Sequence, residues 1–213
     1  MASFTSASNF TVPLAGGSSA TNQGLLMPKL KFRFRLSFIN FGVSQGQTIE
    51  LTKQVQDVKR PTLSMEPITI DVYNSKVYLA GKPSWETITI MLRDDAGGNV
   101  SKLVGEQIQK QFDFQEQSSA ASGIDYKFQL LLEILDGGNG ANTPVTLESW
   151  QLYGCFLTQV DYGEMNYATN EQATIGLTVR FDNAEQTPQG NQTTAAGIGA
   201  KVVSQTIGST ITG

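Results

Sequence analysis

Hydrophobic and polar residues alternate over several stretches of the chain, a pattern typical of β-strands with one buried face. The clearest alternation lies in residues 29–41, with Leu30, Phe32, Phe34, Leu36 and Phe38 on one face and Lys31, Arg33, Arg35 and Ser37 on the other. Further strands are predicted at residues 50–60, 125–135, 147–160 and 172–182. Gly154 stands within one of them and predicts a bulge or bend there.

The apolar period changes to that of a helix between residues 100 and 114. The stripe expected to be buried consists of Leu103, Val104, Ile108 and Phe112, and the opposite face of Lys102, Glu106, Gln107, Gln109 and Lys110. Asn99 or Ser101 is expected to cap this helix, because such side chains accept hydrogen bonds from free N–H groups of the first turn. Asp94 and Asp95, just before it, are interpreted as a solvated turn.

The central stretch, residues 68–92, has a different pattern. Two strand-like segments, residues 68–72 and 86–90, flank an excursion that alternates polar and apolar residues but is too short to bury much within its own domain. This excursion consists of Asn74, Ser75, Lys76, Val77, Tyr78, Leu79, Ala80 and Gly81. An apolar strand edge exposed to solvent is a site of association. We therefore predict an arm by which one copy of the chain holds the next.

These elements together predict a mainly β fold: an antiparallel β-barrel or sandwich with one flanking α-helix and an extended β-hairpin arm. A length of 213 residues suits one domain with a substantial core. We assign residues 29–183 to this domain. Residues 1–28 and 184–213, rich in small and polar residues, are assigned to an N-terminal and a C-terminal extension.

Composition narrows the possible chemistry. The chain has no histidine and a single cysteine, Cys155, which lies in an apolar run and is expected to be buried. An internal disulfide is therefore impossible, and no metal site or cofactor is expected. Gly97-Gly98 lacks the Lys and Ser/Thr that follow in a phosphate-binding loop. We expect no catalytic residues and no enzymatic activity.

Charge and hydropathy bear on partners and location. The net charge of −4 does not favour a nucleic-acid-binding protein, and the cations of residues 29–41 are more simply a solvated strand face. No stretch approaches the roughly 20 apolar residues of a membrane helix, and no secretory signal pattern is present at the start of the sequence. We expect the protein to be synthesised in a cytoplasm and not to associate with a membrane.

Two blocks of the sequence resemble the tail tube proteins of contractile-tailed bacteriophages and, more loosely, their relatives in injection systems. The first block, residues 72–90, is similar to the family's extended arm with a basic residue, an Ala-Gly step and an aromatic-led strand. The second block, residues 150–181, contains the strand that ends at Tyr153-Gly154-Cys155-Phe156 and the turn-rich link into the closing strand. With the helix between these blocks, the resemblance covers about residues 29–183.

The resemblance implies a structural virion protein that forms hexameric rings with a continuous inner β-barrel. The rings would stack into the inner tube of a contractile tail, which is a conduit for DNA ejection. It also implies tail sheath, baseplate and tape measure proteins as partners, passage of genomic DNA without specific binding, and a location in the virion tail after assembly in the host cytoplasm. In this picture the arm reaches an adjacent subunit or ring.

An acidic wall suits such a conduit, because phosphate-rich DNA would adhere to a basic one. The candidate lumen carboxylates are Asp161, Glu164, Glu171 and Asp182, chosen because they flank or lie on the last strands. A solvated outer face explains any one of them as well.

Two other classes of protein stay open. The near alternative is a tube-fold protein of the baseplate or tail terminus, or of a bacterial contractile injection system. The distant alternative is a β-sandwich binding module, for which Trp150, Tyr162 and Tyr167 are the available aromatic residues.

Overall fold

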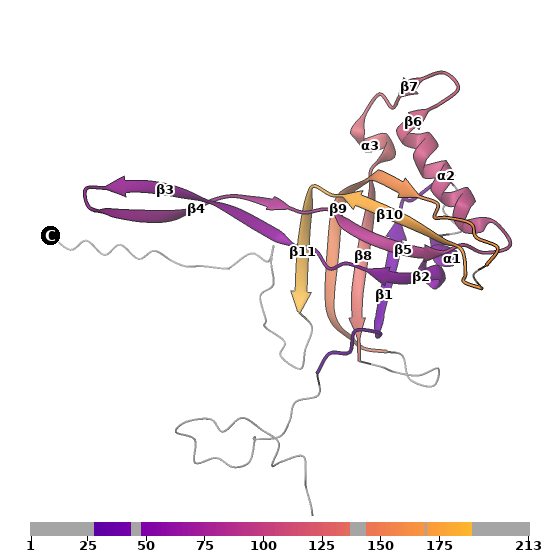
Figure 1. The fold of residues 1–213 in the computed structure, drawn as a ribbon, viewed down its shortest axis with the longest axis horizontal. Helices are drawn as coiled ribbons and strands as arrows, with labels where there is room; N and C mark the ends of the chain where they lie inside the picture. Colours follow the sequence, from indigo (N-terminus) through magenta and orange to yellow (C-terminus); the bar gives the residue numbers. More distant parts are fainter. Residues whose placement is uncertain (1–27, 44–47, 137–143, 169, 189–213) are drawn as a thin grey trace, which may run out of the picture. The chain divides into compact units, whose positions relative to one another are not determined.

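A computed structural model describes residues 28–43, 48–136, 144–168 and 170–188 (Figure 1). The chain divides into two compact units, residues 1–33 and 34–213. Almost all of the N-terminal extension and most of the C-terminal extension lie outside the described residues.

The second unit is built mainly from strands. In the part of it that the structure describes, the strands are β1 (Phe34–Ile39), β2 (Val55–Val58), β3 (Leu63–Val72), β4 (Ser75–Trp85), β5 (Ile88–Arg93), β6 (Phe112–Asp113), β7 (Ser118–Ser119), β8 (Phe128–Leu135), β9 (Thr146–Asp161), β10 (Thr174–Arg180) and β11 (Asn183–Pro188). The helices are α1 (Thr48–Gln54), α2 (Asn99–Gln111) and α3 (Gly123–Tyr126). The predicted mainly β, antiparallel fold is confirmed.

The principal sheet has seven strands in the order β1-β8-β9-β10-β5-β2, and β11 also pairs with β9. The long strand β9 joins two halves of this sheet, because its first half pairs with β8 and β11 and its second half with β10 (Figure 1). Gly154, with a φ of 66°, lies where the partner strand changes from β11 to β10. The register of β9 against β8 shifts here, so the predicted irregularity at Gly154 is confirmed.

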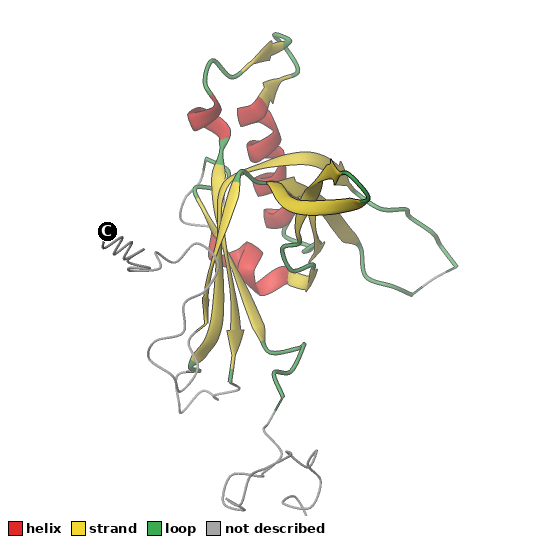
Figure 2. Ribbon diagram, turned by 90° about the vertical axis from the view of Figure 1, so that its left-hand side faces the viewer, coloured by secondary structure: helices red, strands yellow, loops and turns green. Residues whose placement is uncertain are grey.

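The core lies on one face of the sheet, where alternate residues of each strand are buried as the sequence predicts. Strand β8 shows this most regularly, with every second residue from Phe128 to Ile134 buried. Helix α2 adds Val100, Leu103 and Val104 to the same apolar cluster. Figure 2 shows α2 beside the strands.

The first strand is shorter than predicted. Lys31 and Phe32 form a turn, and the Phe32 side chain is 74% exposed. Strand β1 begins only at Phe34, where its pairing with β8 also begins. The predicted burial of Leu36 and Phe38 is confirmed.

Two short helices accompany the predicted one, and the prediction of a strand across residues 50–60 is wrong. Residues Thr48–Gln54 form α1, which buries Leu51, and only Val55–Val58 form a strand. Similarly, the strand predicted to begin at Asp125 begins at Phe128, because Gly123–Tyr126 form α3. The Ser122 hydroxyl accepts a hydrogen bond from the Ile124 N–H and so caps α3.

Helix α2 differs in detail from its prediction. Gln107, predicted on the exposed face, is fully buried, and Phe112 lies in β6. Gly98 precedes the helix in a left-handed conformation, with no side-chain cap of its own. Asp95 instead accepts a hydrogen bond from the Val100 N–H at 3.0 Å, so the predicted caps Asn99 and Ser101 are wrong. Asp95 is a capping residue in addition to a turn residue.

Strand pairing in the second unit continues past residue 183. Residues Asn183–Pro188, most of them predicted as part of the C-terminal extension, form β11 and pair with β9 from Tyr153 back to Glu148. Ala184 is buried in the core. Polar composition hid this strand, because an edge strand needs few apolar residues when its partner supplies the hydrogen bonds.

Candidate functional site

The predicted arm is a two-stranded hairpin of β3 and β4 that extends away from the principal sheet (Figure 1). Its turn is Tyr73-Asn74, so the predicted arm residues 74–81 form one turn position and most of β4. The partner strand, Leu63–Val72, was not predicted as part of the arm. A short polar turn between two β-rich runs was the available signal.

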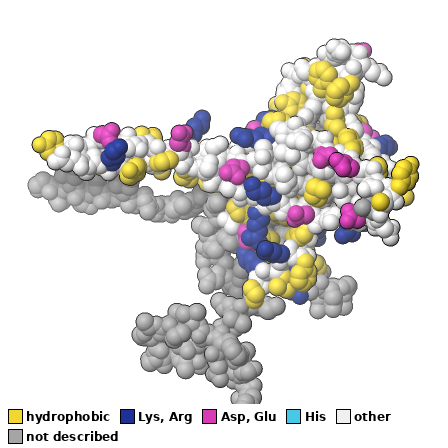
Figure 3. Space-filling model, viewed as in Figure 1, with side chains coloured by type: hydrophobic (Ala, Val, Ile, Leu, Met, Phe, Trp, Pro, Cys, Tyr) yellow, Lys and Arg dark blue, Asp and Glu magenta, His cyan; other side chains and the backbone are white. Residues whose placement is uncertain are grey.

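One face of the distal arm is apolar. Residues directly opposite in an antiparallel pair share a face, and here Ile68 lies opposite Leu79 and Ile70 opposite Val77. These four side chains are 43–54% exposed, and Val72 beside them is 48% exposed. Figure 3 shows apolar side chains along the arm and at its tip.

The other face of the distal arm is polar. Thr69 pairs with Tyr78, and Asp71 pairs with Lys76, whose Nζ lies 3.5 Å from the Asp71 carboxylate. The arm therefore separates an apolar from a polar face, as a strand does when one face is to be covered. Nothing within the described residues of the chain covers the apolar face, because its side chains stay about half exposed.

A bulge sets the twist of the arm near its middle. The register of β3 against β4 shifts between Met65 and Pro67, where β4 contains an extra residue. A Cβ at Gly81 would overlap the backbone oxygen of Glu66. Only glycine fits here, which accounts for the Ala-Gly step of the sequence.

The arm is anchored to the core at its base by Trp85. The Trp85 ring packs edge-on against Trp150 at 6.5 Å between centroids and beside Phe181 at 5.7 Å. Its indole N–H donates to Asn183 Oδ1 at 3.3 Å. The aromatic residue that leads into the next strand thus fixes the base of the arm, and the core cluster contains no residue of the distal arm.

The four candidate lumen carboxylates do not form one cluster. Asp161 is the last residue of β9 and pairs with Gly176, so it lies on the exposed face of the sheet beside Met91. Glu164 and Glu171 lie in the connection from β9 to β10. Asp182 lies at the opposite end of β10, where it forms an ion pair with Lys127 at 2.5 Å.

Glu171 lines an open groove of about 440 Å³ at the edge of the sheet. The other lining residues are Gln56, Asp57, Met91, Gln172 and Thr174. The Gln172 side-chain amide donates to Gln56 Oε1 at 3.1 Å across this groove. Asp57 and Glu171 are the carboxylates of this groove. Among the described residues no group of three or more His, Cys, Asp or Glu side chains could hold a metal ion.

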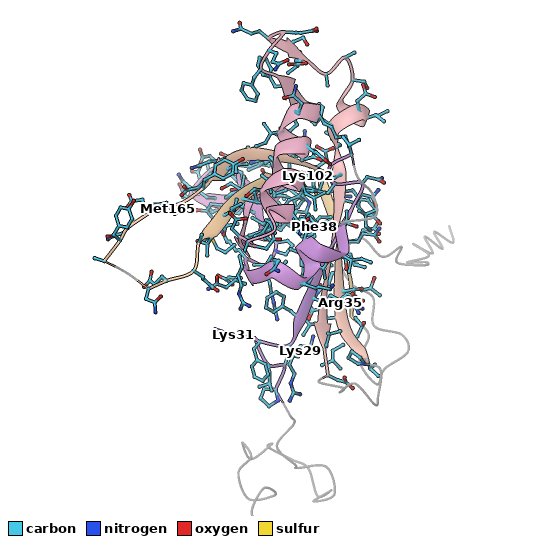
Figure 4. The ribbon with its side chains drawn as sticks, turned by 90° about the vertical axis from the view of Figure 1, so that its right-hand side faces the viewer. Lys29, Lys31, Arg35, Phe38, Lys102 and Met165 are labelled. Atoms are coloured by element: carbon cyan, nitrogen blue, oxygen red, sulfur yellow. The ribbon has the colours of Figure 1, made fainter. Side chains whose placement is uncertain are left out.

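The connection after β9 carries a second exposed surface. Tyr162 is half exposed, Met165 is 82% exposed, and Tyr167 is fully exposed. Two hydrogen bonds from backbone N–H groups shape this loop: Gly163 to Asp161 Oδ1 and Ala168 to Asn166 Oδ1, both at 2.9 Å. Figure 4 shows Met165 on a loop that extends away from the strands.

Cys155 is buried, as predicted from the sequence. Burial in the apolar core raises the pKa of its thiol to about 12, so the thiolate that a nucleophile or metal ligand needs does not form at neutral pH. In the described part of the chain, no helix combines the length and hydropathy needed to cross a membrane.

Comparison with solved structures identifies proteins that share this fold. A chain of the anti-feeding prophage (AFP) tube terminating cap is similar over 81% of this chain and 99% of its own length, with 16% identity and a TM-score of 0.58. A chain of the sheath-tube complex of PVC, an extracellular contractile injection system in its extended state, is similar over 76% of this chain and 93% of its own, with 16% identity and a TM-score of 0.56. A chain of the 6-fold symmetrised AFP baseplate is similar over 77% and 98%, with 12% identity and a TM-score of 0.54.

No protein-family model and no curated protein sequence matches the chain. At 12–16% identity the structural likeness shows the fold alone. The chain therefore has the fold of components of contractile injection systems, in agreement with the resemblance drawn from its sequence.

Proposed function

We propose that this chain is a structural protein that forms the inner tube of a contractile phage tail by stacking of hexameric rings. The fold likeness supports a tube-type building block, since the similar chains come from a sheath-tube complex, a tube terminating cap and a 6-fold symmetrised baseplate. In the phage tail this tube is the conduit for DNA ejection. Tail sheath, baseplate and tape measure proteins are its proposed partners, and assembly takes place in the host cytoplasm.

The observation that carries the proposal is the arm. An isolated two-stranded hairpin is marginally stable at best in water. Here such a hairpin exposes Ile68, Ile70, Val72, Val77 and Leu79 on one face. Burial of apolar surface stabilises by about 25 cal/mol per Å², so covering this face by a second copy stabilises both the arm and the assembly.

The ends of the sheet support closure into a ring. Strands β1, β2 and β11 each pair on one edge only within the described chain, so their other backbone groups are available to a neighbouring copy. A heterologous contact between two different edges closes into a ring when the rotation is right, and repetition along the axis then builds a tube.

The exposed sheet face around Asp161 is the proposed conduit wall. Thr89, Thr178 and Gly176 place short side chains or none on this face, beside Met91. A wall of short, uncharged and acidic groups binds phosphate weakly, so a DNA duplex can slide along it. We propose Asp161, Glu164, Glu171 and Asp182 as lumen carboxylates. Asp161 has the strongest support from its place on this face, and Asp182 the weakest because Lys127 neutralises it.

The test is negative-stain electron microscopy of the purified full chain at rising concentration. Hollow rings or tubes are expected for the wild type. Ile70→Asp, on the apolar face of the arm, is expected to abolish them, and Thr69→Asp, which places the same charge on the polar face, is the matched control. Assembly of Ile70→Asp at wild-type concentrations would contradict the role of the arm.

The second candidate is a baseplate or terminator protein, of a phage or of a bacterial contractile injection system. It is favoured by the likeness to chains of the AFP cap and baseplate, whose TM-scores are close to that of the sheath-tube complex. The same micrographs separate the two candidates. A tube protein gives tubes whose length grows with concentration, and a baseplate or terminator protein stops at single or double rings.

A further inference from the structure

The chain carries two exposed apolar surfaces at opposite ends of the same strands. The arm leaves the sheet next to Ile88, the first residue of β5, and the loop of Tyr162, Met165 and Tyr167 leads into β10 next to Arg93, the last residue of β5. A six-residue strand spans roughly 17–20 Å. Because the arm extends away from its end of β5, the two surfaces face different neighbours.

We propose that the loop of residues 162–167 of one copy receives the apolar face of the arm of the next copy. This inference rests on the proposed function and specifies its contact: the partner of the arm is a second copy of this chain, held at the opposite end of the sheet. The contact joins two different surfaces, so it repeats head to tail.

The chemistry of the two surfaces is complementary in apolar character. Tyr and Met are enriched at protein interfaces, and the flexible Met165 side chain can fill gaps between branched residues such as Ile68 and Val77. Tyr162 and Tyr167 present large apolar rings with a hydroxyl that can stay in water at the rim. The two surfaces are also alike in being exposed on the single chain.

The base of the arm and the loop are complementary in charge. Strands β3 and β4 carry Lys76 and Lys82 against Glu66 and Asp71, a net charge of zero (two minus two), and Lys59 and Arg60 against Glu86 at the base of the arm add a net charge of +1. Residues 161–173 carry Asp161, Glu164 and Glu171 and no cation, a net charge of −3. Within the described residues Arg60 and Lys82 make no ion pair, so they remain for carboxylates of a partner. Opposite charges steer the two ends together and disfavour contact between two equal ends.

For Glu164 this inference replaces the role in the lumen wall by a role in the contact between copies. A lumen carboxylate can be replaced by lysine without loss of assembly, whereas a carboxylate in the contact between copies cannot. Glu164→Lys therefore distinguishes the two roles by assembly alone.

The experiment compares four full-length variants by analytical ultracentrifugation and electron microscopy. Tyr167→Asp in the loop and Ile70→Asp in the arm are each expected to raise the concentration for half-maximal assembly by about tenfold or more, as hot-spot residues do. Ile124→Asp is the matched control, because Ile124 is 86% exposed but lies on α3, away from both surfaces. Glu164→Lys is the fourth variant and is expected to raise this concentration as well, whereas assembly at the wild-type concentration would overturn the role of Glu164 in the contact. Unchanged melting temperatures establish that all four fold.

A mixture of the two defective chains gives the sharpest result. The Tyr167→Asp chain keeps an intact arm and the Ile70→Asp chain keeps an intact loop, so an equimolar mixture is expected to form complexes that contain both chains although neither assembles alone. A mixture that remains monomeric, or a Tyr167→Asp chain that assembles like the wild type, would overturn the inference. If Tyr167→Asp assembles like the wild type and Ile70→Asp does not assemble, the proposed function of the arm stands. In that case the arm binds a surface other than the loop of residues 162–167. A wild-type chain that stays monomeric at every concentration would overturn both, because the contact needs no third partner.

Discussion

The Asp182 carboxylate lies against the Gly154 backbone at the point where β9 changes its partner strand. Gly154 has a φ of 66°, and a Cβ at this position would overlap the Asp182 carboxylate, which is held by Lys127. The Asp182 N–H also donates to the Tyr153 carbonyl at 3.0 Å. The change of partner strand in β9 thus depends on glycine at position 154, because the ion pair of Asp182 with Lys127 occupies the space of a side chain.

Replacing Gly154 by alanine is expected to lower the free energy of unfolding by about 1–3 kcal/mol, because alanine is strained in this conformation and displaces Asp182. Thermal denaturation measures the change, at about 2–4 °C per kcal/mol for a chain of this size. The control is Gly105→Ala in the exposed part of α2, where a Cβ meets open space. That variant is expected to gain about 1 kcal/mol from helix propensity. Equal effects of the two substitutions would refute the role assigned to Gly154.

The buried Gln107 is the second point where one side chain holds separate segments. Its Oε1 accepts from the Gly42 N–H at 2.9 Å, and its Nε2 donates to the Tyr126 carbonyl at 2.7 Å. Gln107→Leu keeps the volume but leaves both backbone groups unsatisfied, so we expect a loss of about 2–5 kcal/mol in chemical denaturation. Gln109→Leu on the exposed face of the same helix should change stability by about 0.5 kcal/mol or less. A loss at Gln107 no larger than at Gln109 would mean that these bonds contribute little.

The strands were predicted best where a run of alternating polar and apolar residues is bounded by turn residues. Residues 147–160 and 172–182 were predicted within two residues of β9 and β10, because their buried face is continuous and their ends carry turn residues. The prediction failed where a single buried residue decides the structure. Helix α1 buries Leu51 in only seven residues, too few for a helical period to be distinguished from a strand.

The exposed apolar face of the arm was predicted only in part. The apolar residues of β4 were found from their own alternation, but their partners on β3 were assigned to the body because Ile68, Ile70 and Val72 look like buried residues. Polar residues posed the opposite difficulty: Gln107 is buried by bonds to Gly42 and Tyr126 that no local pattern shows. The position of each loop at one or the other end of the sheet depends on the order of the strands. Hydrophobic periodicity does not predict that order.

The bulge in the arm offers a way to alter the arm and leave the body intact. Gly81→Ala places a methyl group on the Glu66 backbone oxygen and is expected to disrupt pairing of β3 with β4. Since the arm contributes nothing to the core beyond its base at Trp85, the melting temperature should stay close to that of the wild type while assembly is lost. Electron microscopy and thermal denaturation of the same preparation test this. Ala80→Ser, one residue earlier on the exposed arm, is the control and should assemble normally.

Cys155 should be unreactive in the folded protein. Burial raises its thiol pKa to about 12, so at pH 8 almost no thiolate is present, and the sulfur is also inaccessible. Iodoacetamide is expected to modify no cysteine in the native chain and one per chain in denaturant. Gln159→Cys, an exposed position on the same strand, should react once in the native state. Rapid native modification of Cys155 itself would show that the sheet opens at β9.

The carboxylate of Asp95 makes the start of α2 sensitive to acid. Its hydrogen bond from the Val100 N–H, with a further one from the Asn99 side chain, lowers the pKa of Asp95 below its usual value. The folded-state pKa is depressed, so this contribution to stability is fully present above the pKa of unfolded aspartate and is lost as the pH falls from about 4 through the folded-state value. Asp95→Asn should therefore be less stable than the wild type at pH 7, and the difference should shrink towards about pH 3. Asp94→Asn is the matched control, because it removes a charge from the same turn but keeps an acceptor for the Ser101 hydroxyl. A difference between wild type and Asp95→Asn that stays constant from neutral to acid pH would show that the charge of Asp95 does not stabilise the helix.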